Sequence, residues 1–422
     1  MASRARSLVA ATAVAAALTV TALVAPSAAD ARPLTPPYWK TSADTRMAGA
    51  LTARATTARF GTRFTGAVLD ARTGTVLWSK NGSTALMPAS TLKFVAATNA
   101  LRRYGPTYRF TTIVRRGGQA DQVVLVGSGD PALSTAQVTA LAKQTATAMK
   151  YKGQTRVRVY ADDRLFASPT LATGWPSRYI PAETTWLRSL VVDGRQVNDT
   201  TMDAAAIFAA KLKTYGITVA SVARGSSSTA NPVLATSAGQ TMDQLVTHMM
   251  LESDNEHAEA LNRLVATGTG QTGTWSGGRT AATHGLAAEG LAATAIYDGS
   301  GLSRSDRLSG LQLARMVSNT FERGNWTPFR VLSSGAGLPR AGQTGTLRAS
   351  YGRFTASTSK CAVGKVYAKT GTLSDAVALA GWTVGEDAHV KAFAFIINGN
   401  PTSVTTMRQN IDMLAATVNG CY

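Results

Sequence analysis

Apolar positions recur with two spacings along this 422-residue chain, and the two spacings predict different elements. A spacing of three to four residues predicts amphipathic helices, and alternation with a period of two predicts strands. Strands are predicted at 63–70, 74–79, 108–115, 122–126, 156–161, 364–369, 376–384 and 390–398. Helices are predicted at 48–58, 88–103, 134–149, 202–215, 242–265, 280–286, 311–323 and 411–419. The first two strands should form a hairpin, and the whole pattern predicts an α/β (α+β) fold with a largely antiparallel sheet between helical layers.

The stretch between residues 105 and 193 differs in pattern from the chain on either side of it. Short strands alternate there with loops, and Gly127–Pro131 and Ala172–Pro176 are rich in turn-forming residues. We interpret 105–193 as an inserted, smaller α/β domain. The main domain is then formed by residues 30–104 together with residues 194–422.

The first 29 residues are typical of a secretory signal peptide. Arg4 and Arg6 precede an apolar run from Leu8 to Val24, and small residues at 26–31 offer a cleavage site. An uncleaved membrane anchor is the alternative. No later apolar run approaches the roughly 20 residues that span a bilayer. We therefore expect an exported protein that acts in the cell wall, in the periplasmic space or in the medium.

Charge and cysteine content narrow the expected partners. The formal net charge is +19, and removal of Arg4 and Arg6 with the signal peptide leaves +17. On an exported protein, such diffuse charge suits anionic wall polymers or a membrane surface as partners. The chain lacks the long basic block that is typical of nucleic-acid binding, so nucleic acid is not expected as a partner. Outside the cell, Cys361 and Cys421 predict a disulfide. The chain has only four histidines, and they are scattered, so no metal or cofactor is expected. His257 is expected on the surface of a helix.

Ser90 and Lys93 lie three positions apart at the start of the helix predicted after Pro88. That spacing places them on one face of the first turn, and a hydroxyl beside an amine suits a nucleophile and its base. Ser-x-x-Lys is a short motif, and the alternative is a capping serine with a solvated lysine. A second copy, Ser357 to Lys360, lies in a polar run without a following apolar helix and is discounted.

Two further motifs carry candidate chemistry. They comprise Ser253, Asp254 and Asn255 inside the helix predicted at 242–265, and Lys369, Thr370, Gly371 and Thr372 at the end of an apolar strand. Gly371 would allow a substrate backbone to approach the strand. An extended peptide could pair with the strand while Lys369 and the two threonine hydroxyls receive a carboxylate. Gln343–Leu347 echoes the motif without its lysine and is interpreted as a loop.

Ser-x-x-Lys, Ser-Asp-Asn and Lys-Thr-Gly in this order resemble the signature of penicillin-binding proteins and serine β-lactamases. Ser90 and Ser253 are 163 positions apart, farther than in a compact β-lactamase. The chain therefore resembles the low-molecular-mass class C penicillin-binding proteins, the D-alanyl-D-alanine carboxypeptidase/endopeptidase family. The resemblance extends to 127–133, 253–261, 298–304, 338–347, 368–373 and 378–382. It implies a penicillin-binding-protein/serine β-lactamase-like transpeptidase fold. Larger members carry two nested insertions, and here we expect one, with a trimmed second insertion as the alternative.

The resemblance also implies roles for the motif residues. Ser90 would attack the carbonyl of the penultimate D-alanine, and Lys93 would take its proton. This requires a lowered lysine pKa, from burial and from neighbouring cations such as Lys369. Ser253 would relay a proton to the leaving amine, and Asn255 would hold Lys93 and the substrate amide. The remaining implied sites are the oxyanion hole, at the backbone N–H groups of Ser90 and Thr372, and the carboxylate site, at Lys369, Thr370, Gly371 and Thr372. Peptidoglycan stem peptides would be the substrates, and β-lactam antibiotics would be covalent inhibitors.

Two other functions fit part of this pattern: a class A β-lactamase and a non-catalytic penicillin-binding wall protein. A class A β-lactamase needs a glutamate in a Glu-x-x-Leu-Asn setting between the second and third motifs. Glu259–Asn262 is one residue short and begins only four residues after Asn255, and Glu289 and Glu322 lack the context. A non-catalytic penicillin-binding wall protein would keep the same motifs. The sequence leaves open whether the enzyme is a carboxypeptidase or an endopeptidase.

Overall fold

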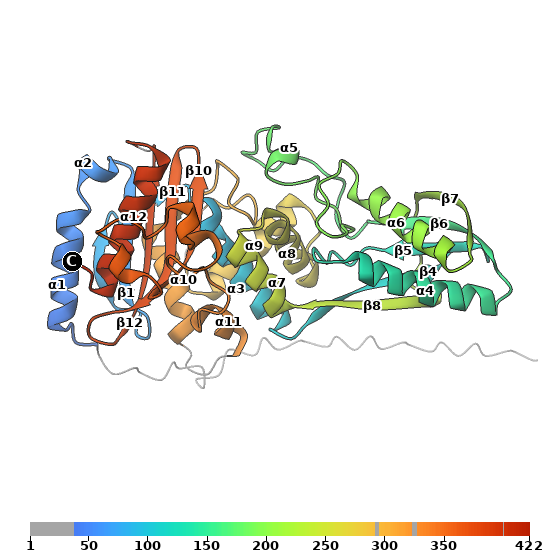
Figure 1. The fold of residues 1–422 in the computed structure, drawn as a ribbon, viewed down its shortest axis with the longest axis horizontal. Helices are drawn as coiled ribbons and strands as arrows, with labels where there is room; N and C mark the ends of the chain where they lie inside the picture. Colours follow the sequence, from blue (N-terminus) through green and yellow to red (C-terminus); the bar gives the residue numbers. More distant parts are fainter. Residues whose placement is uncertain (1–37, 292–294, 323–326, 400) are drawn as a thin grey trace, which may run out of the picture. The chain divides into compact units, whose positions relative to one another are not determined.

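The computed structural model describes residues 38–291, 295–322, 327–399 and 401–422 (Figure 1). Residues Tyr38–Tyr422 form one compact unit. The signal peptide predicted at 1–29 lies outside the described residues. Within the described ranges, none of the helices combines the length and the apolar character needed to cross a bilayer.

A five-stranded antiparallel sheet forms the centre of the main part of the fold, in the order β10-β11-β12-β1-β2. Its strands are β1 (Phe64–Asp70), β2 (Val76–Lys80), β10 (Val366–Leu373), β11 (Ala376–Val384) and β12 (Val390–Asn398). The predicted hairpin is confirmed, because β1 pairs antiparallel with β2 and joins Gly66 to Lys80. The sheet places β10, with the third motif, at its edge.

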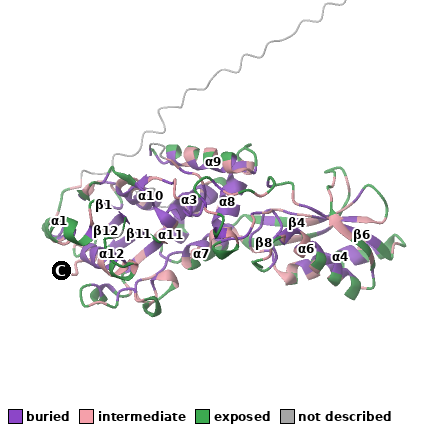
Figure 2. Cartoon of the chain, turned by 90° about the horizontal axis from the view of Figure 1, so that it is seen from above, coloured by how far each residue is buried: buried purple, intermediate pink, exposed green. Residues whose placement is uncertain are grey.

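Helices cover both faces of this sheet, which confirms the predicted layers. One face carries α1 (Ser42–Arg54), α2 (Thr57–Phe60) and α12 (Val404–Asn419); the other carries α3 (Lys93–Tyr104), α7 (Met242–Glu252), α8 (Asn255–Gly268), α9 (Trp275–Ala288), α10 (Gly310–Glu322) and α11 (Arg330–Ser333). In β12, Phe393 and Phe395 pack in the core with α1 and α12, while Ala394 and Ile396 pack in the core with α3 and α10. This period of two explains why the strand is buried from residue 391 to its end (Figure 2).

A second sheet of five strands has the order β7-β6-β5-β4-β8. Its elements are β4 (Arg109–Arg116), β5 (Gln122–Val126), α4 (Thr135–Tyr151), β6 (Arg156–Asp162), α5 (Tyr179–Ala182), α6 (Thr200–Thr214), β7 (Thr218–Arg224) and β8 (Val233–Thr241). Strands β5, β6 and β7 run parallel, and β4 pairs antiparallel with β5 and β8. Apolar residues of α4 and α6 form one core with the strands.

The second sheet and its helices α4 and α6 share a core of their own, and we call them the second unit. The boundary predicted at residue 193 falls inside this unit and is wrong. Phe208 and Leu212 of α6 and Ala235 of β8 belong to the same core as the earlier strands. The second unit therefore continues to Thr241, directly before α7. The pattern of the sequence did not predict β7, because this strand is mostly solvent-exposed and lacks an apolar stripe. Without β7, helix α6 was assigned to the main domain.

Short elements complete the fold. They are β3 (Ala85–Leu86), β9 (Leu308–Ser309) and the 3₁₀ turns η2 (Ala89–Leu92), η3 (Thr327–Phe329), η4 (Gly345–Leu347), η5 (Ala349–Tyr351) and η6 (Lys360–Ala362). Cys361 and Cys421 form the predicted disulfide, with their Cα atoms 6.2 Å apart. The bridge joins the segment before β10 to the residues after α12.

Candidate active site

The turn that carries Ser90 is a 3₁₀ turn, η2, which leads into α3 at Lys93. The helix predicted from residue 88 therefore has two parts. Ala89 has a φ of 47°, a left-handed conformation that is unusual for a residue with a side chain. Such strain persists only where the surroundings impose it and is frequent at active sites. Gly301 makes room for this backbone, since a Cβ there would lie 2.0 Å from the Ala89 carbonyl oxygen.

Gly371 supports the same turn from the side of the sheet. A Cβ at this position would lie 2.8 Å from the carbonyl oxygen of Pro88. The close approach that the structure shows at this glycine is that of η2, and the approach of a substrate backbone to β10 stays a prediction. The missing side chain allows η2 to pack against β10, which brings the first and third motifs together.

Lys93 is fully buried beneath Ser90 and has three oxygen neighbours. Its Nζ lies 3.0 Å from Ser90 Oγ, 2.8 Å from Asn255 Oδ1 and 2.8 Å from the Ser300 carbonyl oxygen. The amide and carbonyl oxygens can only accept hydrogen bonds. A neutral amine that donates both hydrogens to them directs its lone pair toward the Ser90 hydroxyl.

Burial lowers the pKa of Lys93 to about 8, because the interior disfavours the charged form. The carboxylates of Glu259 and Asp298 act in the opposite direction and favour the ammonium. Burial also holds the pKa of Lys369 well below its usual range, and the charge of Lys93 adds to this effect. Both lysines of the site are therefore poised to lose a proton far more easily than lysines in water.

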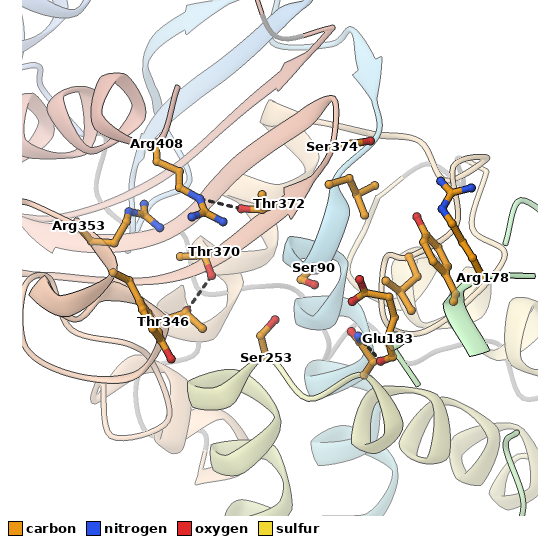
Figure 3. A pocket seen from close by; sticks show the side chains of 15 residues that line it. Ser90, Arg178, Glu183, Ser253, Thr346, Arg353, Thr370, Thr372, Ser374 and Arg408 are labelled. Carbon is orange, nitrogen blue, oxygen red and sulfur yellow. Dashed lines mark hydrogen bonds between the residues drawn. The ribbon is translucent and has the colours of Figure 1, made fainter. Parts of the chain in front are cut away.

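The Ser-Asp-Asn motif is a loop between two helices, so the single helix predicted at 242–265 is wrong. Helix α7 ends at Glu252, and Ser253 adopts a left-handed conformation with a φ of 61°. Asp254 then caps α8 by accepting a hydrogen bond of 2.9 Å from the backbone N–H of His257. The break turns Ser253 toward Ser90 and directs Asn255 toward Lys93 (Figure 3).

Each motif residue of this loop contacts a different part of the site. Ser253 Oγ accepts a hydrogen bond of 2.8 Å from Lys369 Nζ. Asn255 accepts from Lys93 and donates through Nδ2 to the Glu183 carbonyl oxygen at 2.9 Å. The segment after α5, which lies between the strands of the second sheet in the sequence, therefore holds this amide in place.

The edge of β10 is covered only along its first half. The Ala341 N–H donates to the Val366 carbonyl oxygen, and the Ala368 N–H donates to Pro339. Beyond Ala368, no backbone group of the described chain pairs with this edge. The open half begins at Lys369, and the pairing of an extended peptide with it stays a prediction.

Lys369 itself does not reach this open space. Its side chain is fully buried, and Nζ donates to Ser253 Oγ and to the Thr370 carbonyl oxygen, at 2.8 and 2.7 Å. The structure therefore places Lys369 behind Ser253, whereas the sequence suggested that it receives a carboxylate. Thr370 and Thr372 do face the open space.

A cavity of about 730 Å³ lies above Ser90 (Figure 3). Its lining residues are Ser90, Arg178, Tyr179, Glu183, Ser253, Asn255, Leu302, Thr346, Tyr351, Arg353, Thr370, Thr372, Leu373, Ser374 and Arg408. Arg408 Nε donates to Thr372 Oγ1 over 3.4 Å, and Thr346 Oγ1 is 2.7 Å from Thr370 Oγ1. Sequence reasoning missed these two residues. The repeated Thr-Gly-Thr at 344–346 was the available signal for Thr346, and no motif marks Arg408.

Two sequence candidates are clearly separated from the cavity. Glu259 is fully buried, and its carboxylate accepts hydrogen bonds from the backbone N–H groups of Gly299 and Ser300. It orders the loop whose carbonyl contacts Lys93, and it does not line the cavity as the deacylating glutamate of a β-lactamase would. Ser357 and Lys360 of the second Ser-x-x-Lys are both solvent-exposed.

A cluster of possible metal ligands lies beside the second motif: His248, Asp254 and His257. The expectation that His257 lies on a helix surface is wrong, because only 7% of this residue is exposed. The break at Ser253 brings the two histidines together, which their spacing in the sequence did not suggest.

Comparison with known proteins identifies the family of this chain. The model of the D-Ala-D-Ala carboxypeptidase 3 (S13) family matches residues 47–184 and 188–418. A carboxypeptidase of Mycobacterium tuberculosis is 31% identical over 361 residues, which cover 80% of this chain and 76% of the relative. A D-alanyl-D-alanine carboxypeptidase of Actinomadura is 27% identical over 430 residues, with coverage of 79% and 77%.

Solved structures agree on the fold. Penicillin binding protein 4 of Haemophilus influenzae superposes with a TM-score of 0.73 at 19% identity, over 88% of this chain and 98% of that protein. The likeness confirms the predicted penicillin-binding-protein fold. The chain therefore belongs to the D-Ala-D-Ala carboxypeptidase 3 (S13) family and is a serine-type D-Ala-D-Ala carboxypeptidase.

Proposed function

We propose that this enzyme removes the terminal D-alanine from peptidoglycan stem peptides through an acyl-enzyme formed on Ser90. The observation that carries this proposal is the position of Lys93 Nζ, 3.0 Å from Ser90 Oγ and held by two oxygens that only accept hydrogen bonds. Because burial lowers the lysine pKa to about 8, a useful fraction of this amine is neutral near physiological pH.

Acylation would proceed in two proton-balanced steps. Ser90 Oγ transfers its proton to Lys93 Nζ and bonds to the carbonyl carbon of the penultimate D-alanine. The C–N bond then breaks, and the proton taken up by Lys93 passes through the Ser253 hydroxyl to the leaving amine of the last D-alanine, so that Lys93 is neutral again. The Ser253 hydroxyl is held by a hydrogen bond from Lys369. The backbone N–H groups of Ser90 and Thr372 would stabilise the oxyanion, and the loss of one such donor typically costs about 10²–10³ in rate. Water then cleaves the ester and regenerates the serine.

The substrate carboxylate would bind at the far side of the cavity, where hydroxyls and a cation meet. Thr370 and Thr372 present their hydroxyls there, and the Arg408 guanidinium lies against Thr372. A charged guanidinium bonds a carboxylate more strongly than a neutral donor does. We assign Arg408 the cationic role that the sequence suggested for Lys369.

The same site would accept β-lactams and cross-linked substrates. Opening of a β-lactam ring leaves the amine attached to the acyl group, so the leaving group stays in the cavity and obstructs water. The fold-sharing protein of Haemophilus influenzae is described in complex with a β-lactam. An endopeptidase substrate differs only beyond the scissile bond, and the cavity of about 730 Å³ has room for a larger leaving group.

Labelling by a fluorescent penicillin tests the nucleophile. Ser90→Ala should abolish both the label and the release of D-alanine, while the matched control Ser357→Ala should retain both. Wild-type protein should be incubated with linear pentapeptide and with cross-linked dimer, and the products should be read by mass spectrometry. Persistent labelling of the Ser90→Ala variant would disprove the assignment. Labelling without cleavage of either substrate would instead indicate a non-catalytic penicillin-binding protein. Rapid hydrolysis of nitrocefin would indicate a β-lactamase.

The enzyme would act outside the cytoplasmic membrane, near anionic wall polymers. The signal-like residues 1–29, the Cys361–Cys421 disulfide and the net charge of +19 support this location. Protein isolated from culture should begin after Ala29 or Ala31 in N-terminal sequencing. A cytosolic protein that retains residues 1–29 would contradict the proposal, and binding to purified anionic wall polymer that persists in high salt would contradict an electrostatic contact.

A further inference from the structure

Three potential metal ligands converge where the chain breaks between α7 and α8. Asp254 Oδ2 lies 3.0 Å from His248 Nε2 and 3.1 Å from His257 Nδ1. All three ligand atoms lie within 4.8 Å of one another. A tetrahedral zinc ion with bonds of about 2.0–2.1 Å holds its ligand atoms roughly 3.3 Å apart. The two separations from Asp254 are therefore close to those that one shared ion would impose.

His257 supplies a second, independent indication. The residue is 93% buried, and its Nδ1 atom has no hydrogen-bond partner within the described part of the chain. It lies close to Asp254 Oδ2 without the alignment of a hydrogen bond. A buried polar atom without a partner is uncommon in native proteins. A cation between the imidazole and the carboxylate would satisfy it.

The cluster is held in place and opens to solvent on one side. Asp254 Oδ1 is fixed by the helix-capping bond from the His257 N–H, which leaves Oδ2 directed at both imidazoles. The His248 side chain is 45% exposed and borders a surface cavity of about 350 Å³. Glu252 also borders this cavity, and Asp130 and Glu256 lie around His257. Burial raises the pKa of Asp130 and of Glu256, so that Asp254 is the carboxylate that would hold a cation.

We propose that His248, Asp254 and His257 bind a divalent transition-metal ion of the zinc type, with its fourth position open to water. Two imidazoles and one carboxylate are a common ligand set for such ions. The expectation from the sequence that no metal site exists rested on the scatter of the histidines. At Ser253 the backbone is left-handed and α7 folds back against α8, which brings His248 close to His257.

Bound metal would fasten the two helices across the Ser-Asp-Asn loop. Asp254 lies between Ser253 and Asn255, so an ion on its Oδ2 would restrict the loop that carries the proton relay. The ion would lie outside the catalytic cavity, since His248 and Asp254 do not line it. It would therefore be a structural ion that supports the site, and no catalytic step requires it.

Calorimetric titration of the EDTA-treated full-length enzyme with ZnCl₂ tests the proposal. Wild-type protein should bind one equivalent, and its melting temperature should rise. Losing a hydrogen-bond partner of a metal ligand costs roughly 10–100-fold in affinity, so His248→Gln, which removes a ligand, should lose at least about that much. His284→Gln replaces another exposed histidine on a helix and should bind zinc as wild type does. His257→Gln is the second test, provided its circular dichroism is native.

Cobalt gives an independent spectroscopic measurement. Co²⁺ at this site should show the intense visible absorption of a four-coordinate ion in wild-type protein and in His284→Gln, but not in His248→Gln. Equal zinc affinity in wild type and His248→Gln would overturn the proposal. So would the absence of stoichiometric binding in wild type, which would leave the three residues as a hydrogen-bonded cluster only.

Discussion

The state of the Lys93 amine should control how fast Ser90 is acylated, and the structure fixes the direction of its pH dependence. Lys93 acts as a base only when neutral, so acylation should speed up as pH rises through its pKa. Burial sets that pKa at about 8, compared with 10.5 in water. About 10% of the amine is then neutral at pH 7, compared with roughly 0.03% for an unperturbed lysine, a gain of about 300-fold.

Glu259 allows this reasoning to be tested by a single isosteric change. Its carboxylate favours the ammonium form of Lys93, and burial raises its own pKa to about 7. Glu259→Gln removes the charge but keeps an oxygen for the N–H groups of Gly299 and Ser300. The pKa of Lys93 should therefore fall, and the acid limb of the rate profile should move to lower pH. The difference from wild type should be largest between about pH 7 and 8, where Glu259 is ionised and Lys93 is still partly protonated, and small both near pH 6 and on the plateau.

The assay is the second-order rate constant for acylation by a fluorescent penicillin between about pH 6 and 10, at constant ionic strength. For wild type we expect a rise of about tenfold between pH 7 and 9 and a plateau above. Glu252→Gln is the control, because it neutralises an exposed carboxylate on α7. A midpoint near 10 would refute the burial argument. A shift of the Glu259→Gln limb to higher pH would refute the electrostatic argument.

Two further substitutions test how the cavity is built. Arg408→Gln should lower kcat/KM about 10–100-fold for a peptide with a free terminal carboxylate, since a hydrogen bond to a charged group contributes roughly 1.5–3 kcal/mol. The rate for the same peptide with a terminal amide should change far less in this variant. An equal loss for the acid and the amide would contradict a carboxylate contact. Arg348→Gln, which changes an arginine outside the cavity, is the control. Gly371→Ala should displace the nucleophile turn, because the new Cβ lies 2.8 Å from the Pro88 oxygen, and slow acylation about 10²-fold. Gly49→Ala, whose Cβ meets nothing within 4 Å, should acylate normally; normal acylation of Gly371→Ala would show that the turn does not depend on this packing.

The sequence predicted the elements of the main sheet well because their signal is local. The strands β10, β11 and β12 alternate or are apolar throughout, and each is bounded by turn residues. The second unit was delimited poorly for the opposite reason. Strand β7 is an exposed edge whose pairing with β6 depends on tertiary contacts that no local pattern records.

Within the site, sequence motifs identified which residues meet but not how they are oriented. The break at Ser253 was invisible because Met242–Gly268 is apolar at helical spacing on both sides of it. Arg408 was missed because it lies in α12, far along the chain from every motif, and reaches the cavity only through the packing of that helix on the sheet. Orientation at a break and proximity across the sheet are properties of the folded chain.

In the mechanism that we propose, the two motif lysines act from behind serine hydroxyls and do not touch the substrate. Lys93 and Lys369 are both fully buried, each behind a serine hydroxyl that faces the cavity. An exposed ammonium would stay protonated at physiological pH and could not accept the Ser90 proton. Burial removes that obstacle, and the backbone and amide oxygens around each amine offset part of the desolvation cost. In the mechanism that we propose, the cavity therefore presents hydroxyls to the peptide, while the Lys93 amine beneath them takes up and returns the proton that moves during acylation.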